Sequence, residues 1–179
     1  MTGISDISSF AAIDFETANY RSHSACAVAI VNVEDFRVVD RYYTLIQPPK
    51  NQYYQGFCEL HGIYPKDTLD APTFDQVYND IHERLADRVV VAHNEGFDRR
   101  VLSSSMLYYD LSPSMLDLHK RWECTVKIYR KKGFKPCTLD ACCIRLDIPL
   151  EHHHALSDAE ACATLYMLHL QNAVVRQCL

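Results

Sequence analysis

The chain has 179 residues, of which 48% are hydrophobic and 23% charged, and its formal net charge is −5 at pH 7. This size suits one folded domain over residues 1–179, and the composition excludes a disordered protein. With no apolar run near the roughly 20 residues that cross a bilayer, and no secretory signal in MTGISDISSF, we expect a cytoplasmic protein without a membrane partner. A protein that simply coats nucleic acid would be basic, so any nucleic-acid role here requires bound cations or a local basic patch.

The N-terminal part of the chain predicts three strands in a meander. The runs FAAIDF (10–15), ACAVAIVNV (25–33) and RVVDRYYTLI (37–46) have strand length, and only three residues separate the last two. After a long connection, Thr73 and Gln76 form the pattern of a capping box, which predicts a helix that continues to Leu85.

The remainder predicts two further strands and several helices. VVVAHN (89–94) is a buried strand whose last residue, Asn94, could cap a helix over about 96–108. A short strand is expected between Pro113 and Cys124. Helices are expected near 125–132, 138–146 and 156–175, the last with an inward stripe of Leu156, Ala159, Ala163, Tyr166, Leu170 and Val174. This order of elements predicts an α/β layered domain with a mixed sheet of about five strands.

The eight cysteines are expected to be reduced, buried thiols rather than a disulfide framework. No CxxC pair occurs, Cys142 and Cys143 are adjacent, and several others fall in apolar periodic segments. Cys58 and His61 have the spacing of half a zinc site, but no second half is visible, so a structural zinc is not expected.

Acidic residues lie at, or shortly after, the carboxyl ends of two predicted buried strands, 10–15 and 89–94. Asp14 and Glu16 point to the same face because strand side chains alternate, and the preceding run is apolar. The plain interpretation is that these carboxylates lie on a solvated face of the strand. If they are buried, they require a counter-charge, and the first Lys or Arg in the sequence is Arg21. A divalent cation such as Mg²⁺ or Mn²⁺ would serve. Asp98 lies one turn into the helix after the next buried strand, where it is either a favourable first-turn charge or part of the same site.

A third acidic position follows the run HHHALSDAEACA (152–163), where Asp158 lies in the first turn of the last helix. An affinity tag would have more histidines at a terminus, and three neighbours in one extended run cannot converge on one zinc ion. Two interpretations remain, either a solvated loop or a single histidine beside a metal-binding aspartate.

Taken together, these motifs resemble those of the DEDDh exonucleases, the 3′→5′ proofreading family related to the epsilon subunit of bacterial DNA polymerase III. The resemblance covers about residues 10–172. It is carried by Asp14-Phe15-Glu16-Thr17, by Ala92-His93-Asn94 with Phe97-Asp98, by His153 five residues before Asp158, and by His61-Gly62-Ile63.

The resemblance implies a ribonuclease H-like three-layer fold and a 3′→5′ exonuclease that uses two divalent cations, Mg²⁺ or Mn²⁺. Its metal ligands would be Asp14, Glu16, Asp98 and Asp158, with His153 accepting the proton of the attacking water. Thr17, His61 and Phe97 would hold the terminal nucleotide. The substrate would be the 3′ end of single-stranded DNA or RNA, with a DNA polymerase as a partner or with none.

Several features depart from the family pattern or leave alternatives open. Glu95 stands where a small residue is usual, ANYRSHS (18–24) replaces a Thr-Gly-Leu turn, and His152 and His154 are expected to be bystanders. The basic run 127–135 is either a solvated helix face or a track for phosphates. RNA trimming, a two-metal endonuclease and a non-catalytic nucleic-acid or polymerase-binding module are the alternative functions.

Overall fold

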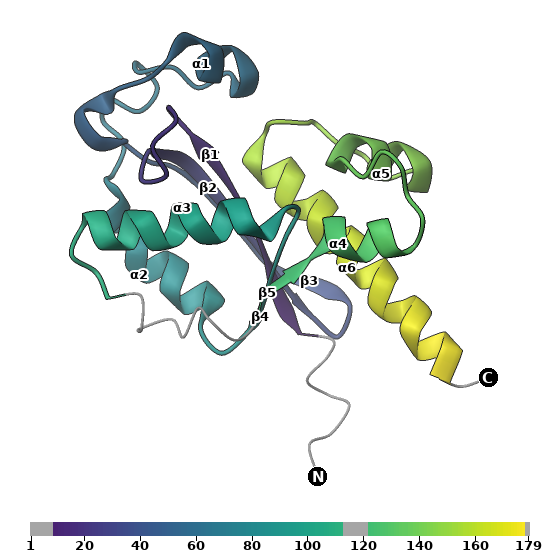
Figure 1. Ribbon diagram of the computed structural model, residues 1–179. Coiled ribbons are helices and arrows are strands. Elements are labelled where there is room, and N and C mark those ends of the chain that lie inside the picture. Colours follow the sequence, from purple (N-terminus) through teal and green to yellow (C-terminus); the bar gives the residue numbers. More distant parts are fainter. Residues whose placement is uncertain (1–8, 113–121, 178–179) are drawn as a thin grey trace.

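The sheet runs through the middle of the protein and has the strand order β3-β2-β1-β4-β5 (Figure 1). The computed structural model describes residues 9–112 and 122–177, of which residues 172–177 are described by their backbone only. The strands are β1 (Phe10–Thr17), β2 (Ala25–Glu34), β3 (Arg37–Leu45), β4 (Val89–Ala92) and β5 (Trp122–Cys124). β1, β2 and β3 pair antiparallel, whereas β4 pairs parallel to both β1 and β5. The predicted mixed five-stranded sheet is confirmed.

The helices of the described chain are α1 (Gln55–His61), α2 (Phe74–Leu85), α3 (Glu95–Tyr108), α4 (Thr125–Lys131), α5 (Leu139–Leu146) and α6 (Ala155–Gln177). Most lie within one or two residues of the predicted bounds, but α1 was not predicted and lies in the connection after β3. Among these helices, none is both long enough and apolar enough to cross a bilayer. The expected strand after Pro113 is described only as β5, since residues 113–121 lie outside the described part.

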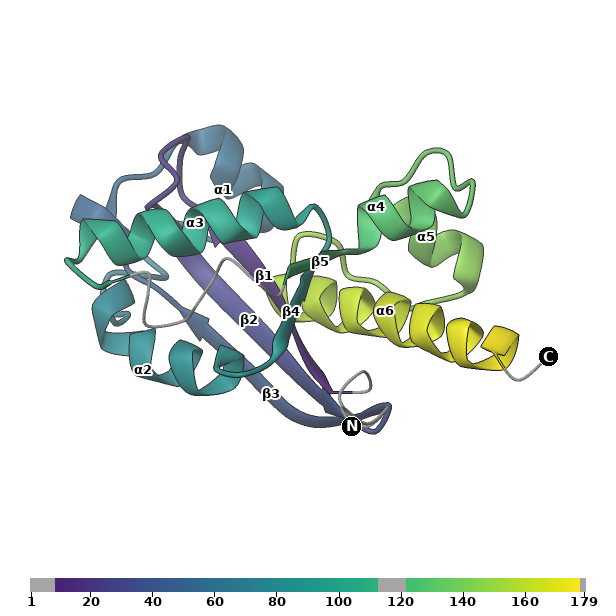
Figure 2. The ribbon, with the colours of Figure 1, turned by 60° about the horizontal axis from the view of Figure 1, so that its bottom comes forward.

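Helices cover both faces of the sheet because the side chains of β1 alternate. Ala11, Ile13 and Phe15 pack with buried residues of α2 and α3, whereas Phe10 and Ala12 pack with buried residues of α6. Figures 1 and 2 show the sheet between these two helical layers. The layer against α6 is rich in small side chains, which let the helix lie close to the strands. The predicted three-layer arrangement is confirmed.

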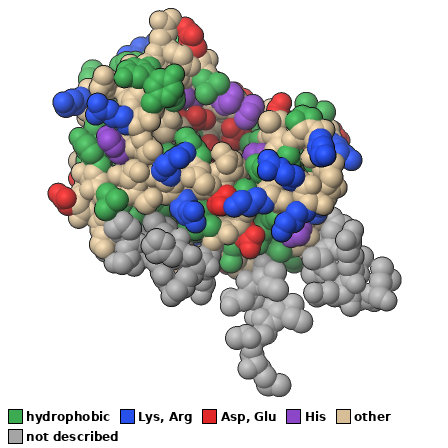
Figure 3. Space-filling view, viewed as in Figure 1, with side chains coloured by type: hydrophobic (Ala, Val, Ile, Leu, Met, Phe, Trp, Pro, Cys, Tyr) green, Lys and Arg blue, Asp and Glu red, His purple; other side chains and the backbone are tan. Residues whose placement is uncertain are grey.

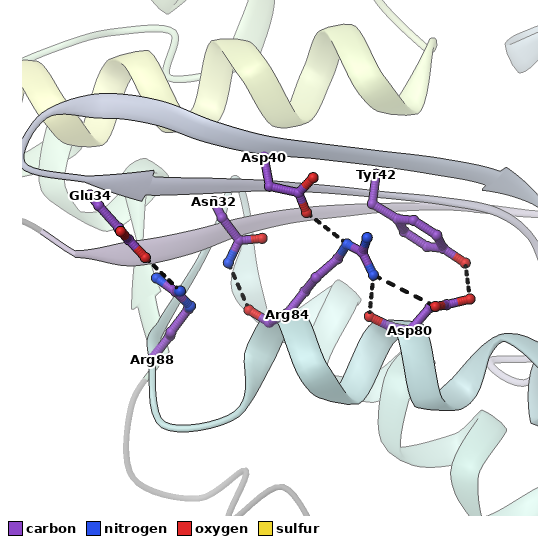
Figure 4. Close-up of polar contacts among 7 residues, drawn as sticks. All are labelled: Asn32, Glu34, Asp40, Tyr42, Asp80, Arg84 and Arg88. Atoms are coloured by element: carbon purple, nitrogen blue, oxygen red, sulfur yellow. Dashed lines mark hydrogen bonds and ion pairs between the residues drawn. The ribbon is translucent and has the colours of Figure 1, made fainter.

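Polar contacts fix α2 against the edge of the sheet (Figure 4). Arg84 Nε lies 2.8 Å from Asp40 Oδ2, and Arg88 Nη2 lies 2.8 Å from Glu34 Oε1. The buried Asn32 donates its amide N–H to the carbonyl of Arg84 at 2.9 Å. Partly exposed ion pairs such as these each contribute about 1 kcal/mol or less. Most of the stability of this contact therefore comes from the apolar side of α2, and the ion pairs orient the helix.

The two predicted helix caps have different outcomes. The capping box at the start of α2 is confirmed, since the Thr73 N–H donates to Gln76 Oε1 at 2.8 Å. Asn94 is the N-cap residue of α3, as predicted, but its side chain does not supply the cap. Asn94 has left-handed backbone angles (φ 76°) and makes no side-chain capping hydrogen bond, and its carbonyl instead accepts the N–H of Phe97 at 2.9 Å. The strand before it also ends earlier than expected, at Ala92.

The cysteines that the structure describes are free thiols, and all but Cys137 are buried. This confirms the prediction of reduced, packed cysteines for that part of the chain. Cys178 and the side chain of Val174, which was expected on the inward stripe of the last helix, lie outside the described residues.

Candidate active site

Three carboxylates meet at the end of β1 where the strand faces α6. Asp14 and Glu16 share the parity of Phe10 and Ala12, so both side chains project toward the layer that contains α6. Asp158 lies in the first turn of α6, and one carboxylate oxygen from each of the three residues lies within 4.8 Å of the others. The prediction that Asp14 and Glu16 point to one face is therefore confirmed, and Asp158 joins them.

A bulge shifts the pairing of β1 with β2 immediately after this acidic pair. The register between β1 and β2 shifts between Glu16 and Thr17. The carbonyl of Thr17 lies 3.2 Å from His61 Nε2, and the N–H of Ile63 donates to His61 Nδ1 at 3.1 Å. Because Nδ1 accepts, the ring is neutral and donates from Nε2. Burial lowers the pKa of His61, in agreement with this tautomer.

Asp98 lies behind β1 rather than inside the cluster of three carboxylates. Its side chain is 1% exposed, and its Oδ1 accepts the N–H of Phe15 at 3.0 Å. Burial is the largest cause of the raised pKa of Asp14, and repulsion from Asp98 is the next largest. The arrangement suits a supporting carboxylate that contacts the site from the α3 side.

All four acidic groups are held in an environment that opposes their ionisation. Burial raises the pKa of all four groups, and at Asp158 this rise is partly offset by its contacts with His152 and His153. Repulsion from neighbouring carboxylates adds to burial at the other three and helps to bring the pKa of Glu16 and of Asp98 to about 8. No Lys or Arg forms a salt bridge with any of them within the described chain. Buried oxygen ligands that lack a cationic side chain are the donor set that Mg²⁺ and Mn²⁺ prefer. These residues therefore fit divalent cations.

The histidine run contacts Asp158 at two points. His152 Nδ1 lies 3.2 Å from Asp158 Oδ2, and the backbone N–H of His153 donates to the same oxygen at 3.1 Å. The rings of His152 and His153 are stacked with centroids 3.9 Å apart, whereas His154 stacks on Tyr43. The expectation that His152 is a bystander is therefore wrong, because it contacts both His153 and the carboxylate. His154 lies apart from them.

His153 itself has features of a functional position. Its φ of 67° is in the left-handed region, which is unusual for a residue other than glycine. Burial and the neighbouring His152 lower its pKa below the ordinary value of 6.5. A neutral ring beside a carboxylate cluster can accept a proton at neutral pH.

A cavity of about 600 Å³ opens over the acidic cluster. Figure 3 shows acidic and histidine side chains gathered in a hollow of the surface. The residues that were predicted to hold the terminal nucleotide, Thr17, His61 and Phe97, all line it. Sequence reasoning missed other lining residues, because they come from α1 and from elements far away in the chain: Phe57, Leu60, His93, Val126, Arg130 and Leu139.

His93, which lines the cavity, and the nearby Glu95 are both occupied by structural contacts. His93 lies between Thr125 Oγ1 (2.8 Å from Nδ1) and the carbonyl of Cys137 (3.2 Å from Nε2), and burial lowers its pKa to about 4. His93 is therefore a neutral part of the wall. Glu95, the unusual acid, is 2.6 Å from Lys127 Nζ. Burial would raise the pKa of Glu95, but the hydrogen bond and charge of Lys127 outweigh it and hold that pKa below its ordinary value.

A sheet edge with buried carboxylates and a histidine loop defines a candidate hydrolase that uses metal ions. The sequence model of the exonuclease family RNase_T matches residues 11–166, and the chain belongs to this family. Among curated relatives, DNA polymerase III PolC-type from Halalkalibacterium halodurans is 28% identical over 96% of this chain and 12% of its own length. DNA polymerase III subunit epsilon from Buchnera aphidicola is 27% identical over 78% of this chain and 62% of its own length. The chain thus spans about an eighth of the PolC-type relatives.

Solved structures show the same fold. The nuclease domain of 3′hExo, described as a DEDDh family member bound to rAMP, superposes with a TM-score of 0.79 at 18% identity, over 96% of this chain and 95% of that one. Exonuclease X in complex with 5′ overhanging duplex DNA has a TM-score of 0.73 at 23% identity, over 92% of each chain. The predicted family and the ribonuclease H-like fold are confirmed.

Proposed function

We propose that this chain is a 3′→5′ exonuclease that hydrolyses the terminal phosphodiester bond of single-stranded DNA or RNA and releases nucleoside 5′-monophosphates. The observation that carries the proposal is the meeting of Asp14, Glu16 and Asp158 with the His152–His153 loop over one cavity. Membership of the exonuclease family supports the reaction type.

Asp14, Glu16 and Asp158 are proposed to hold divalent cations, and Asp98 to support them from behind β1. Two cations, Mg²⁺ or Mn²⁺, would fit four carboxylates that form no salt bridge with Lys or Arg in the described part of the chain. When bound, such ions supply charge neutralisation and Lewis acidity at a scissile phosphate.

The protein's own groups have separate roles in this proposal. His153 takes the proton from the attacking water, since its lowered pKa keeps the ring neutral at pH 7. His152 and the backbone of His153 orient the carboxylate of Asp158 through contacts at 3.1–3.3 Å. Phe97, Thr17 and the neutral His61 lie around the cavity where the terminal nucleotide would bind.

The test is hydrolysis of a 5′-labelled single-stranded oligonucleotide with Mg²⁺, with Mn²⁺ and with EDTA. We expect a ladder that shortens from the 3′ end, 5′-mononucleotide product and no reaction in EDTA. Internal fragments, or cleavage of a circular single strand, would identify an endonuclease instead. Binding without hydrolysis in either metal would identify a non-catalytic module.

The polymer remains to be assigned by comparing kcat/KM on DNA and RNA of the same sequence. Exonuclease action on RNA is the alternative, since one similar structure is a complex with duplex DNA and another is bound to rAMP. A DNA polymerase as partner is proposed from the PolC-type and epsilon relatives. The cytoplasmic location stays a prediction from the sequence.

A further inference from the structure

The cavity over the acidic cluster has one basic side chain in its described wall. Asp14, Glu16 and Asp158 line the cavity from β1 and α6, and the wall formed by α4 contributes Val126 and Arg130. Arg130 is the one Lys or Arg among the described lining residues. A substrate strand is a polyanion, and the protein carries a net charge of −5, so this cation is a strong candidate for a phosphate contact.

Arg130 is also available, unlike Lys127 and Lys132 of the basic run 127–135. Lys127 is held by Glu95 at 2.6 Å, and Lys132 Nζ lies 4.6 Å from the centre of the Tyr129 ring. Within the described chain, Arg130 forms no salt bridge with a carboxylate and its residue is exposed. Its guanidinium group can therefore bind a ligand without first breaking an ion pair.

The helix that carries Arg130 is fixed to the core, so the side chain starts from a defined position. Tyr129, beside it in the sequence, is 2% exposed and donates its hydroxyl to the carbonyl of Leu165 in α6 at 2.9 Å. Thr125 at the first residue of α4 is buried and contacts His93. The Lys127–Glu95 ion pair ties the exposed side of α4 to the start of α3. A cation on a fixed helix can select one position along a strand.

We propose that Arg130 binds the phosphate immediately 5′ of the scissile one. This inference rests on the proposed exonuclease function. The scissile phosphate would face the carboxylate cluster and its cations, whereas the next phosphate along the strand brings a charge that these ions do not neutralise. Arg130 gives that phosphate a partner, through the paired N–H groups with which guanidinium binds phosphate oxygens. Residues 127–135 are thus neither a solvated helix face throughout nor a continuous track for phosphates, because Arg130 of this run lines the cavity.

The sharpest test combines a change in the protein with a change in the substrate. Arg130→Ala, Arg130→Lys and a control, Lys131→Ala, are compared with wild type on a single-stranded oligonucleotide. The oligonucleotide carries either a phosphodiester or an uncharged methylphosphonate at the second linkage from the 3′ end. Lys131 is exposed, next to Arg130, and absent from the cavity lining. A second substrate, the p-nitrophenyl ester of thymidine 5′-monophosphate, contains only the scissile phosphate.

We expect Arg130→Ala to lower kcat/KM on the normal oligonucleotide by roughly 10-fold or more, the size typical of a hydrogen-bonded charged group. The methylphosphonate should lower the wild-type value by a similar factor and should have little added effect on Arg130→Ala. Arg130→Lys should recover part of the loss. Lys131→Ala, and every variant on the p-nitrophenyl ester, should stay within about twofold of wild type. A methylphosphonate penalty that is equally large in wild type and Arg130→Ala would overturn the assignment.

An equilibrium measurement keeps the inference separate from the proposed reaction. The affinity of a fluorescently labelled single strand is measured by anisotropy in EDTA at several salt concentrations. Loss of one phosphate contact should reduce the slope of log K against log salt by about 0.7 in Arg130→Ala and not in Lys131→Ala. If wild type binds but hydrolyses neither substrate, the exonuclease proposal fails while this slope still decides the role of Arg130. Equal slopes in wild type and Arg130→Ala would reject it.

Discussion

Glu16→Gln should stabilise the metal-free protein, and the gain should grow with pH. Burial and the charges of Asp158 and Asp98 raise the pKa of Glu16 from 4.5 to about 8 in the folded protein. A carboxyl group whose pKa is higher in the folded than in the unfolded protein adds to the free energy of unfolding. This contribution is complete below the unfolded pKa and is lost as pH rises through the folded pKa. Wild type should therefore lose stability between about pH 4.5 and pH 8, whereas Gln has no charge to bury.

The size of the effect follows from the interval between the two pKa values. At about 1.4 kcal/mol per pH unit, the interval from 4.5 to about 8 gives an upper limit of roughly 5 kcal/mol at pH 9. Sharing of protons among the four coupled carboxylates reduces this, so we expect about 1–3 kcal/mol. For a chain of this length, 1 kcal/mol moves Tm by about 2–4 °C.

The assay is thermal unfolding in EDTA at pH 5, 7 and 9, followed by circular dichroism. The matched control is Glu59→Gln, which changes an exposed carboxylate on α1. Saturating Mn²⁺ should reverse the order at pH 7, because ions that bind the folded state stabilise wild type more than the variant. The reasoning is refuted if Glu16→Gln and wild type keep the same difference in Tm at pH 5 and pH 9.

Further outcomes are expected at the site and in the core. Asp14→Ala should abolish hydrolysis while the protein stays folded, checked by product release and circular dichroism, and residual activity near wild type would remove Asp14 from the site. His153→Ala should lose about 10²- to 10⁴-fold in kcat, and His154→Ala should stay within several-fold; equal losses would show that the loop is offset. At fixed metal saturation, the wild-type rate should rise with pH and reach half of its plateau below pH 6.5, since burial and His152 lower the pKa of His153 from that value, and a midpoint well above pH 6.5 would exclude its role as the proton acceptor. His152→Asn can keep a donor near Asp158 and should retain more activity than His152→Leu, whereas equal rates would mean that the contact with Asp158 is idle. Leu102→Ala, at a fully buried position of α3, should cost about 2–5 kcal/mol in urea unfolding, and a loss under 1 kcal/mol would mean that this layer repacks.

Local periodicity was enough to predict most of the framework. The alternation of strand side chains placed Asp14 and Glu16 on one face, and the capping box at Thr73 marked the start of α2 correctly. Spacing within the motifs selected the residues that surround the cavity, because the carboxyl end of β1 and the start of α6 meet at the same edge.

Contacts between distant segments were beyond the reach of such patterns. The spacing of the histidines did not reveal that His152 contacts Asp158, since the turn of the loop decides this. The pairing of Glu95 with Lys127 joins residues 32 apart, and α1 lacks an apolar stripe that periodicity could detect. Asn94 occupies the predicted N-cap position of α3, but its left-handed backbone and the lack of a side-chain capping hydrogen bond could not be read from the residue type.

The β-bulge between Glu16 and Thr17 divides the chain into a part that cannot tolerate a change of length and a part that can. Before the bulge, inserting or deleting one residue in β1 would exchange the faces of the strand, turning Asp14 and Glu16 toward α2 and α3 and apolar side chains toward α6. After it, the register has already shifted, so the exposed tip of the following loop, at Tyr20, can change without rotating the acidic pair, whereas the buried ends of the loop at Ala18 and Ser24 are held by hydrogen bonds. The exposed tip of that loop can therefore vary while Asp14 and Glu16, the proposed ligands of the cations, keep their places.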